Sequence, residues 1–182
     1  MSNVMSDLAR LLETHIPQLR RYARALTRDL TRADDLVQSC LVRALAKQHL
    51  WQPGTNLRAW LFTILHNLHV NDRRCALREG VCVGDETAPS IPAVVPNAVL
   101  SLELRDLERA IALLSEEQRQ VILLVGLEGM RYETVASVLD IPVGTVRSRL
   151  SRARHALRRM MEGRQRMTPH DQYEAKLERR AA

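Results

Sequence analysis

Aromatic residues are scarce in this 182-residue sequence: one phenylalanine, two tryptophans and three tyrosines make up 3% of it. Strands favour aromatic and β-branched residues that alternate with polar ones, and no stretch of the sequence shows that alternation. Leucine, alanine, arginine and glutamate dominate instead, and all four are good helix formers. The sequence therefore predicts an all-α protein.

Long apolar runs are also missing. The longest are a few residues, such as 121–125, which is far too short to span a bilayer. Residues 1–10 lack the apolar centre of a signal peptide. We therefore expect a cytoplasmic protein with no direct membrane insertion.

The three cysteines (Cys40, Cys75 and Cys82) are an odd number and have no C-x-x-C spacing. This pattern favours neither a disulfide framework nor a zinc knuckle, so we interpret them as reduced thiols. His66 and His69 lie three residues apart and could mimic a metal site together with Cys75, but a fourth ligand at suitable spacing is missing. We expect no metal and no cofactor.

Motifs for catalysis are absent as well. The sequence has no phosphate-binding Gly-x-x-x-x-Gly-Lys loop, no Ser/His/Asp set and no paired carboxylates in a suitable context, so an enzyme is not expected.

What the chain does have is basic charge, with 27 Lys and Arg against 21 Asp and Glu and a net charge of +6. That balance indicates a polyanionic partner, which on composition alone is either nucleic acid or an acidic membrane surface.

Residues 128–161 have the pattern of a helix-turn-helix. The first short helix carries Val135, Ala136 and Leu139 on one face, and the pattern breaks at Asp140. Pro142 then suits the first position of a second helix, because its missing N–H costs nothing there. An apolar stripe at helical spacing continues along that second helix through Val146, Leu150, Ala153 and Leu157.

The other face of this second helix is strongly basic. Residues 142–161 contain no acidic residue, and Thr145, Ser148 and Ser151 lie near the front. A solvated helix face usually mixes both charge signs, whereas phosphates and guanine edges bind arginine donors. We therefore predict DNA recognition by this helix. Its six arginines are Arg147, Arg149, Arg152, Arg154, Arg158 and Arg159.

The apolar pattern of the first part of the chain predicts one helix over 8–30, or two helices with a joint near Pro17. It predicts a turn over 29–32 and then another helix that starts at Ala33. This last helix would start with two acids, Asp34 and Asp35, which suit the helix dipole. Gln38 would share its outward face. An ordinary helix with an acidic first turn would have the same pattern.

A Pro-Gly turn at 52–56 precedes a helix over 57–77, which Thr55 or Asn56 can cap. Trp60 lies on the apolar stripe of this helix, where it is either a core residue or a wedge that unstacks bases. The polar side carries Asn67, with the basic residues near the end of the helix. That combination offers base-edge donors beside phosphate-binding cations.

Periodicity disappears over residues 78–98, where three prolines fall close together. We interpret this segment as a flexible linker between two small helical domains, 8–77 and 99–162, the second of which contains the helix-turn-helix. At about 3.3 Å per residue the linker reaches on the order of 65 Å, roughly two turns of duplex DNA. Ser115 begins a capping box within the second domain. A charged tail of residues 163–182 follows.

These segments together resemble a known family. Residues 118–124, 127–130, 132–133, 142–150 and 152–154 resemble the domain of bacterial RNA polymerase sigma factors that recognises the −35 element, above all in the extracytoplasmic-function group. Residues 33–38 are similar to the sigma segment that grips core polymerase, and 56–67 resemble the segment that recognises and opens the −10 element. Three positions depart from the family pattern: it commonly has an acid near Ser39, an aromatic at Leu41 and a small hydroxyl at Arg131.

The resemblance implies a sigma factor that binds core RNA polymerase and promoter DNA, traps unstacked bases and is paired with an anti-sigma factor. For the −35 element it implies Thr145, Arg147, Ser148, Arg149 and Arg152; for the −10 element Thr55, Asn56, Asn67, Arg73 and Arg74; and for core polymerase Asp34, Asp35 and Gln38.

Three other functions compete with this interpretation. A plain helix-turn-helix regulator would explain the basic helix but not residues 56–67, and a sigma-like mimic that binds only an anti-sigma protein would not need the arginines. An enzyme such as a recombinase would need a nucleophile and an acidic cluster, and neither is evident in the sequence.

Overall fold

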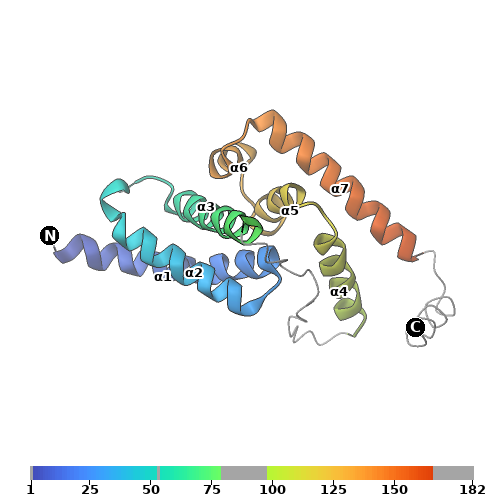
Figure 1. Cartoon of the computed structure of the whole chain (residues 1–182), viewed down its shortest axis with the longest axis horizontal. Helices are drawn as coiled ribbons and strands as arrows, with labels where there is room; N and C mark the ends of the chain where they lie inside the picture. The colour runs from blue at the N-terminus through green and yellow to red at the C-terminus, as the bar shows by residue number, and fades with distance from the viewer. Residues whose placement is uncertain (1, 53, 79–97, 166–182) are drawn as a thin grey trace.

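The computed structural model describes residues 2–52, 54–78 and 98–165, and within them all regular structure is helical (Figure 1). This confirms the all-α prediction. Most of the expected linker, from residue 79 to 97, and the tail beyond residue 165 lie outside the described residues. None of the described helices combines the length and the apolar character that crossing a bilayer requires.

The first unit comprises α1 (Ser2–Thr27), α2 (Leu30–Ala46), the 3₁₀ turn η1 (Gln48–Leu50) and α3 (Leu57–Arg78). Pro17 lies inside α1, which continues as one helix rather than two. Arg28 makes the tight turn to α2 with a positive φ of 59°. Tyr22 from α1 and Phe62 from α3 are fully buried, with ring centroids 5.2 Å apart, and they anchor the core of this unit.

The start of α2 differs from the sequence expectation. Asp29 is its N-cap, and the carboxylate of Asp29 accepts the backbone N–H of Arg32 at 3.0 Å. The helix therefore begins at Leu30, and the turn expected over 29–32 is wrong. As a result Asp34 and Asp35 lie in the second turn, not in the first turn where we placed them, because a cap one turn earlier satisfies the helix terminus.

The second unit comprises α4 (Ala98–Ala112), α5 (Glu116–Ile122), the π-helical segment η2 (Leu123–Leu127), α6 (Tyr132–Leu139) and α7 (Val143–Gln165). Helices α6 and α7 form the helix-turn-helix. Asp140 ends α6 in the left-handed conformation, with φ 52°, and the carbonyl of Pro142 accepts the N–H of Thr145 at 2.9 Å. Arg131, the N-cap residue of α6, makes no side-chain cap hydrogen bond, whereas the small hydroxyl residue common in the family could make one.

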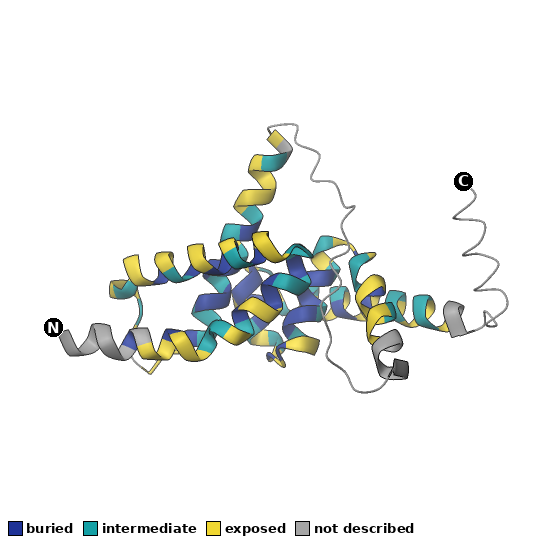
Figure 2. Ribbon diagram, turned by 90° about the horizontal axis from the view of Figure 1, so that it is seen from below, coloured by how far each residue is buried: buried dark blue, intermediate teal, exposed yellow. Residues whose placement is uncertain are grey.

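The two units pack against each other through one continuous core. Residues from both contribute to it, including Leu61 and Leu65 of α3 with Val121 of α5 and Leu124 of η2, all of them fully buried. Figure 2 shows the buried residues gathered at the centre of the molecule, while the ends of α3 and α7 extend from it with exposed or partly exposed surfaces. Helix α3 lies against α6, and α1 lies against η2.

Candidate nucleic-acid interface

The second helix of the motif, α7, presents a row of polar side chains along its first turns. Arg147, Ser148 and Arg152 are exposed on the side opposite the buried apolar stripe. The Ser148 hydroxyl donates to the carbonyl of Thr145 at 3.0 Å, and Arg152 Nε donates to the carbonyl of Ser148 at 3.3 Å. These local hydrogen bonds hold Ser148 and Arg152 along one edge of the helix and leave further guanidinium donors of Arg152 for a ligand.

Arg149 is arranged differently from its neighbours. Its side chain is only 20% exposed, and Nη2 lies 3.0 Å from Oε1 of Glu117 at the start of α5. The sequence showed correctly that α7 offers no acid to its own arginines over 142–161. The acid comes instead from another helix, a pairing that no pattern within α7 could reveal.

A shallow hollow of about 290 Å³ lies between the start of α6 and the outer flank of α7. Its charged lining residues are arginines. Sequence reasoning gave no DNA-binding role to Tyr132 or His155, which help to form it, because a single residue of either type carries little signal. The lining residues are Tyr132, Arg147, Leu150, Ser151, Arg154, His155 and Arg158.

In the first unit, the residues expected at the −10 element divide between two faces of α3. Asn67, Asn71 and Arg74 are exposed and follow one another at helical spacing, so they share a face. Arg73 is also exposed but lies on the face of His69, where its Nη1 is 3.9 Å from Glu116. The structure therefore brings Asn67 together with Arg74 and places Arg73 apart from them.

The loop before α3 is fixed by its own hydrogen bonds. Gly54 has a φ of 87°, and the hydroxyl of Thr55 donates to the carbonyl of Gln52 at 2.7 Å. The side-chain oxygen of Asn56 accepts the N–H of Ala59 at 3.0 Å, so Asn56 rather than Thr55 caps α3. At a rise of about 1.5 Å per residue, Asn56 and Asn67 are roughly 16 Å apart along the helix.

The residues expected to bind core polymerase lie along α2. Asp35 and Gln38 are exposed. Asp34 is only partly exposed and turns toward α1, where its Oδ1 lies 3.5 Å from Arg20 Nε and 3.8 Å from Arg24 Nη2. The outward surface is therefore formed by Asp35 and Gln38, and Asp34 helps to hold α1 and α2 together.

The junction between the units contains a fully buried carboxylate, Glu128. Its Oε1 lies 3.0 Å from Arg21 Nη2 of α1, and its Oε2 lies 2.8 Å from Arg58 Nη2 of α3. Arg58 also donates to the backbone carbonyl of Glu128 at 2.6 Å. A buried charge is tolerated when it is paired and hydrogen-bonded in this way. Sequence reasoning gave Glu128 no such role, since its partners lie 70 and 107 residues away.

A second polar contact between the units is centred on Glu116. It accepts hydrogen bonds at 2.8 Å from Nε2 of His69 and at 3.0 Å from Nε2 of Gln120, and it lies 3.5 Å from Arg119. Burial alone would raise the pKa of Glu116, but the hydrogen bond and charge of His69, with help from Arg119 and Gln120, lower it below the ordinary value. Glu116 is therefore ionised at neutral pH.

His66 and His69 do not converge with Cys75 on a metal site. His69 is buried against Glu116, whereas the Cys75 thiol is exposed. The described part of the chain contains no cluster of three or more histidine, cysteine or acidic side chains that could hold a metal. Burial, and then the neighbouring His69, lower the pKa of His66.

Comparison with known proteins gives two family matches. Residues 12–66 match the family "Sigma2 domain of PhyR", and residues 104–157 match "Sigma-70, region 4". The sequence is 42% identical over 142 residues to the ECF RNA polymerase sigma factor EcfG of Rhodopseudomonas palustris, covering 78% of each chain. It is 36% identical over 152 residues to the ECF sigma factor SigL of Mycobacterium tuberculosis, covering 81% of this chain and 85% of the relative.

The fold is similar to that of a solved sigma factor. The structure of the sigma factor RpoE in complex with the anti-sigma factor NepR, from Bartonella quintana, superposes with a TM-score of 0.72 at 38% sequence identity. The superposition covers 86% of this chain and 97% of the Bartonella chain. Both units of the present structure therefore have counterparts in that protein.

Proposed function

This chain belongs to the extracytoplasmic-function group of RNA polymerase sigma factors, and we propose that its two units divide promoter recognition between them. The chain directs core RNA polymerase to promoter DNA. In our assignment the first unit binds core polymerase and the −10 element, and the second binds the −35 element. The observation that carries this assignment is the exposed row of Arg147, Ser148 and Arg152 at the front of α7.

At the −35 element, the front of α7 enters the major groove, which is wide enough to admit a helix. Arg147 and Arg152 can each donate two hydrogen bonds to a guanine edge, and Ser148 can bond either partner of a base pair. Thr145 lies at the first turn of α7, near the flanking phosphates. Arg149 reaches DNA only by exchanging its Glu117 partner for a phosphate or a base.

At the −10 element, the loop at Gly54–Asn56 takes up an unstacked base and α3 contacts the strand that follows. Asn67 can pair with a base edge, while Arg74 on the same face neutralises a phosphate. Arg73 contributes from the adjoining face. Unpairing a short stretch of the DNA duplex costs a few kcal/mol. The capture of one base and a few phosphate contacts can offset this cost, so no nucleotide-driven motor is needed.

Core polymerase binds the outward surface of α2 at Asp35 and Gln38, with Asp34 supporting that surface from its contacts to Arg20 and Arg24. An anti-sigma factor regulates the chain, by analogy with NepR on the Bartonella sigma factor. The chain is an initiation factor rather than an enzyme, because polymerase performs the chemistry, and it acts in the cytoplasm, where polymerase and DNA meet.

The test is run-off transcription with purified core polymerase and a pool of genomic promoters. The chain should make polymerase start at a defined promoter set, which neither a plain regulator nor a mimic would do. On such a promoter, Arg147→Ala and Arg152→Ala should each cost about 1–3 kcal/mol of binding if they contact bases. Arg105→Ala, which removes an exposed arginine of α4, is the matched control and should bind as the parent does. If the footprint over the −35 element is unchanged when Arg147→Ala and Arg152→Ala are combined, α7 does not recognise this element.

A further inference from the structure

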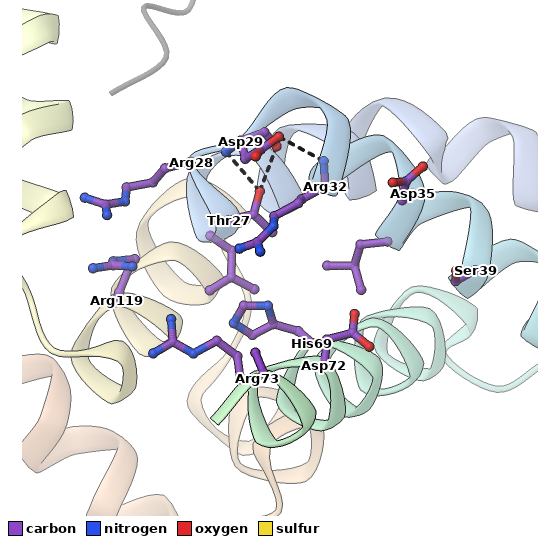
Figure 3. A pocket seen from close by; sticks show the side chains of 13 residues that line it. Thr27, Arg28, Asp29, Arg32, Asp35, Ser39, His69, Asp72, Arg73 and Arg119 are labelled. Atoms are coloured by element: carbon purple, nitrogen blue, oxygen red, sulfur yellow. Dashed lines mark hydrogen bonds between the residues drawn. The ribbon is translucent and has the colours of Figure 1, made fainter. Parts of the chain in front are cut away.

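Arginines gather at two places where the units meet. One is a pocket of about 280 Å³ between the α1–α2 turn, the end of α3 and the start of α5 (Figure 3). Its arginines are accompanied by acids that line the same pocket, namely Asp29, Asp35 and Asp72. The other place is different, because Arg21 of α1 and Arg58 of α3 share one carboxylate, that of Glu128. We call Arg21 and Arg58 the arginine pair.

The arginine pair belongs to the first unit, whereas the carboxylate that it shares belongs to the second. Glu128 Oε1 accepts the N–H of Arg21 Nε at 3.0 Å, and Oε2 accepts that of Arg58 Nη2 at 2.8 Å. If the units separate, the two guanidinium groups stay together while this shared counter-charge leaves with the second unit. Two cations close enough to share one carboxylate then repel each other. An anion bound in the place of Glu128 would remove that repulsion.

Arg58 is held in position by its own unit. Its Cζ lies 5.7 Å from the centre of the Phe62 ring, which is fully buried in the core of the first unit. Nη2 makes both of the hydrogen bonds to Glu128, one to the carboxylate and one to the backbone carbonyl. The buried Nε has no hydrogen-bond acceptor among the described residues. Glu128 therefore uses only part of the fork that a guanidinium offers to a carboxylate or a phosphate.

The arginine pair lies beside the loop to which we assigned an unstacked base. Arg58 is in the first turn of α3, two residues after Asn56, which caps that helix. A base held at Gly54–Asn56 brings its own phosphate close to this turn of α3. The first unit thus places two cations near the path of the captured strand.

The packed arrangement of the units cannot hold both promoter elements at once. By their numbering, the −35 and −10 elements lie about 25 base pairs apart, roughly 85 Å at about 3.4 Å per pair. Arg58 contacts Glu128, and the chain from Glu128 to Arg147 runs through α6 and the turn into α7. Even with every residue outside those helices fully extended, that path covers at most about 45 Å. On a promoter, α3 and the front of α7 must therefore move apart, and Glu128 must leave the arginine pair.

We propose that the arginine pair binds a phosphate of the −10 strand, and that Glu128 occupies this site while the units are packed together. The proposal rests on the proposed function, because it takes the strand from our assignment of the −10 element to α3. A carboxylate and a phosphate offer arginine the same kind of charged oxygen acceptor. Glu128 therefore competes with DNA, and binding of the strand at this site excludes the packed arrangement.

The test measures binding of a fluorescein-labelled single-stranded oligonucleotide to the full chain by fluorescence anisotropy, without polymerase. Glu128→Gln removes the competing charge and should bind the oligonucleotide at least fivefold more tightly than Glu133→Gln. Glu133 is the matched control, because it is an exposed acid of the same unit. One additional phosphate contact should also steepen the dependence of log K on log salt by about 0.7.

Second substitutions show whether the gain comes from the arginine pair. Arg58→Gln or the half-exposed Arg21→Gln, each combined with Glu128→Gln, should abolish the tighter binding and the steeper salt dependence. Arg105→Gln on the exposed surface of α4 removes the same charge and should leave most of the gain. Arg58→Gln alone should change binding less than twofold, since Glu128 covers the site in the parent chain. Circular dichroism checks that each variant keeps the helix content of the parent.

The proposal is overturned if Glu128→Gln binds the oligonucleotide as Glu133→Gln does. It is also overturned if the gain persists when Arg21→Gln or Arg58→Gln is added in a chain that keeps its helix content. Failure of the proposed function has a different signature, which is the absence of defined starts in run-off transcription. Strand binding is measured without polymerase or promoter, so the two failures are distinguishable.

Discussion

At the scale of single residues, Asn67 is the side chain whose role in opening DNA is most directly testable. It is exposed beside Arg74 on α3 and makes no part of the buried core. We predict that Asn67→Ala lowers open-complex formation on duplex promoters and is largely rescued on templates already mismatched at the −10 element. Permanganate reactivity of unpaired thymines measures opening. A defect of equal size on the mismatched templates would place Asn67 in binding or folding instead.

Glu116 gives a second residue-scale prediction, because its pKa is lowered by His69 and Arg119 despite burial. A carboxylate whose folded pKa lies below its unfolded value of 4.5 stabilises the fold fully above that value, and the contribution is lost as pH falls through the folded pKa. The free energy of unfolding should therefore decrease as the pH is lowered from about 4.5. Urea titrations at a series of pH values measure it.

The matched variants are Glu116→Gln and Glu117→Gln, since the neighbouring Glu117 is 65% exposed. Subtracting the Glu116→Gln curve from that of the parent should leave a difference that is constant above pH 4.5 and shrinks below it. Glu117→Gln should follow the parent much more closely. Parallel curves for the parent and Glu116→Gln throughout the acid range would contradict the assignment.

Which residue contacts could be predicted from the sequence depended on how far apart the partners lie in the chain. The N-cap of α5 at Ser115 was predicted correctly, because a capping pattern spans only three residues, and Asn56 was one of two caps proposed for α3. The pairs of Arg149 with Glu117 and of Arg58 with Glu128 were not predicted. Nothing local indicates them, because they form only when separate helices pack together.

At the scale of helices, the turn of the helix-turn-helix depends on one residue in an unusual backbone conformation. Asp140 has φ 52° and ψ 51° at the end of α6, and the N–H of Ile141 bonds back to the carbonyl of Ala136 at 3.1 Å. Asparagine tolerates this left-handed conformation, whereas a β-branched residue does not. Asp140→Val should therefore lower the free energy of unfolding by about 1–2 kcal/mol relative to Asp140→Asn.

Urea unfolding of the two variants measures this difference. Circular dichroism checks that both retain the helix content of the parent. If Asp140→Val and Asp140→Asn unfold at the same urea concentration, the left-handed conformation of residue 140 is not required. The backbone at residue 140 must then relax at little cost in stability.

Helix types and their order followed from the apolar periodicity, but irregular helix geometry did not. Residues 123–127 form a π-helical segment, in which the N–H of Glu128 bonds to the carbonyl of Leu123 at 3.0 Å, five residues back. Pattern analysis assumes 3.6 residues per turn and could not detect it. The wider turn follows α5 directly and leads to Glu128 at the junction of the units. The π-helical geometry of residues 123–127 therefore depends on the tertiary packing around them.

At the scale of the whole molecule, the arrangement of the two units rests on a shared apolar core and on the ion pairs of Glu128. The sequence indicated two helical units but not that they would pack together, since each has its own apolar stripes. The Glu128 side chain is fully buried, while those of Arg21 and Arg58 are 52% and 29% exposed. The buried charge is thus the carboxylate, and the arginines keep contact with water. Because the carboxylate is fully buried and the arginines are not, it can be predicted which substitutions lower the free energy of unfolding most.

Removing the two arginines should cost more stability than removing the carboxylate. Arg21→Ala combined with Arg58→Ala leaves a buried charge unpaired, which costs about 3–5 kcal/mol. Glu128→Gln leaves only part-exposed arginines, which water can solvate, and should cost about 1–3 kcal/mol. Adding Glu128→Gln to the double arginine variant should therefore restore stability. Urea unfolding measures all three, and Glu133→Gln on the exposed face of α6 is the matched control. If the triple variant is less stable than the double variant, the unpaired carboxylate is not what destabilises it, and the junction is held by its apolar core alone.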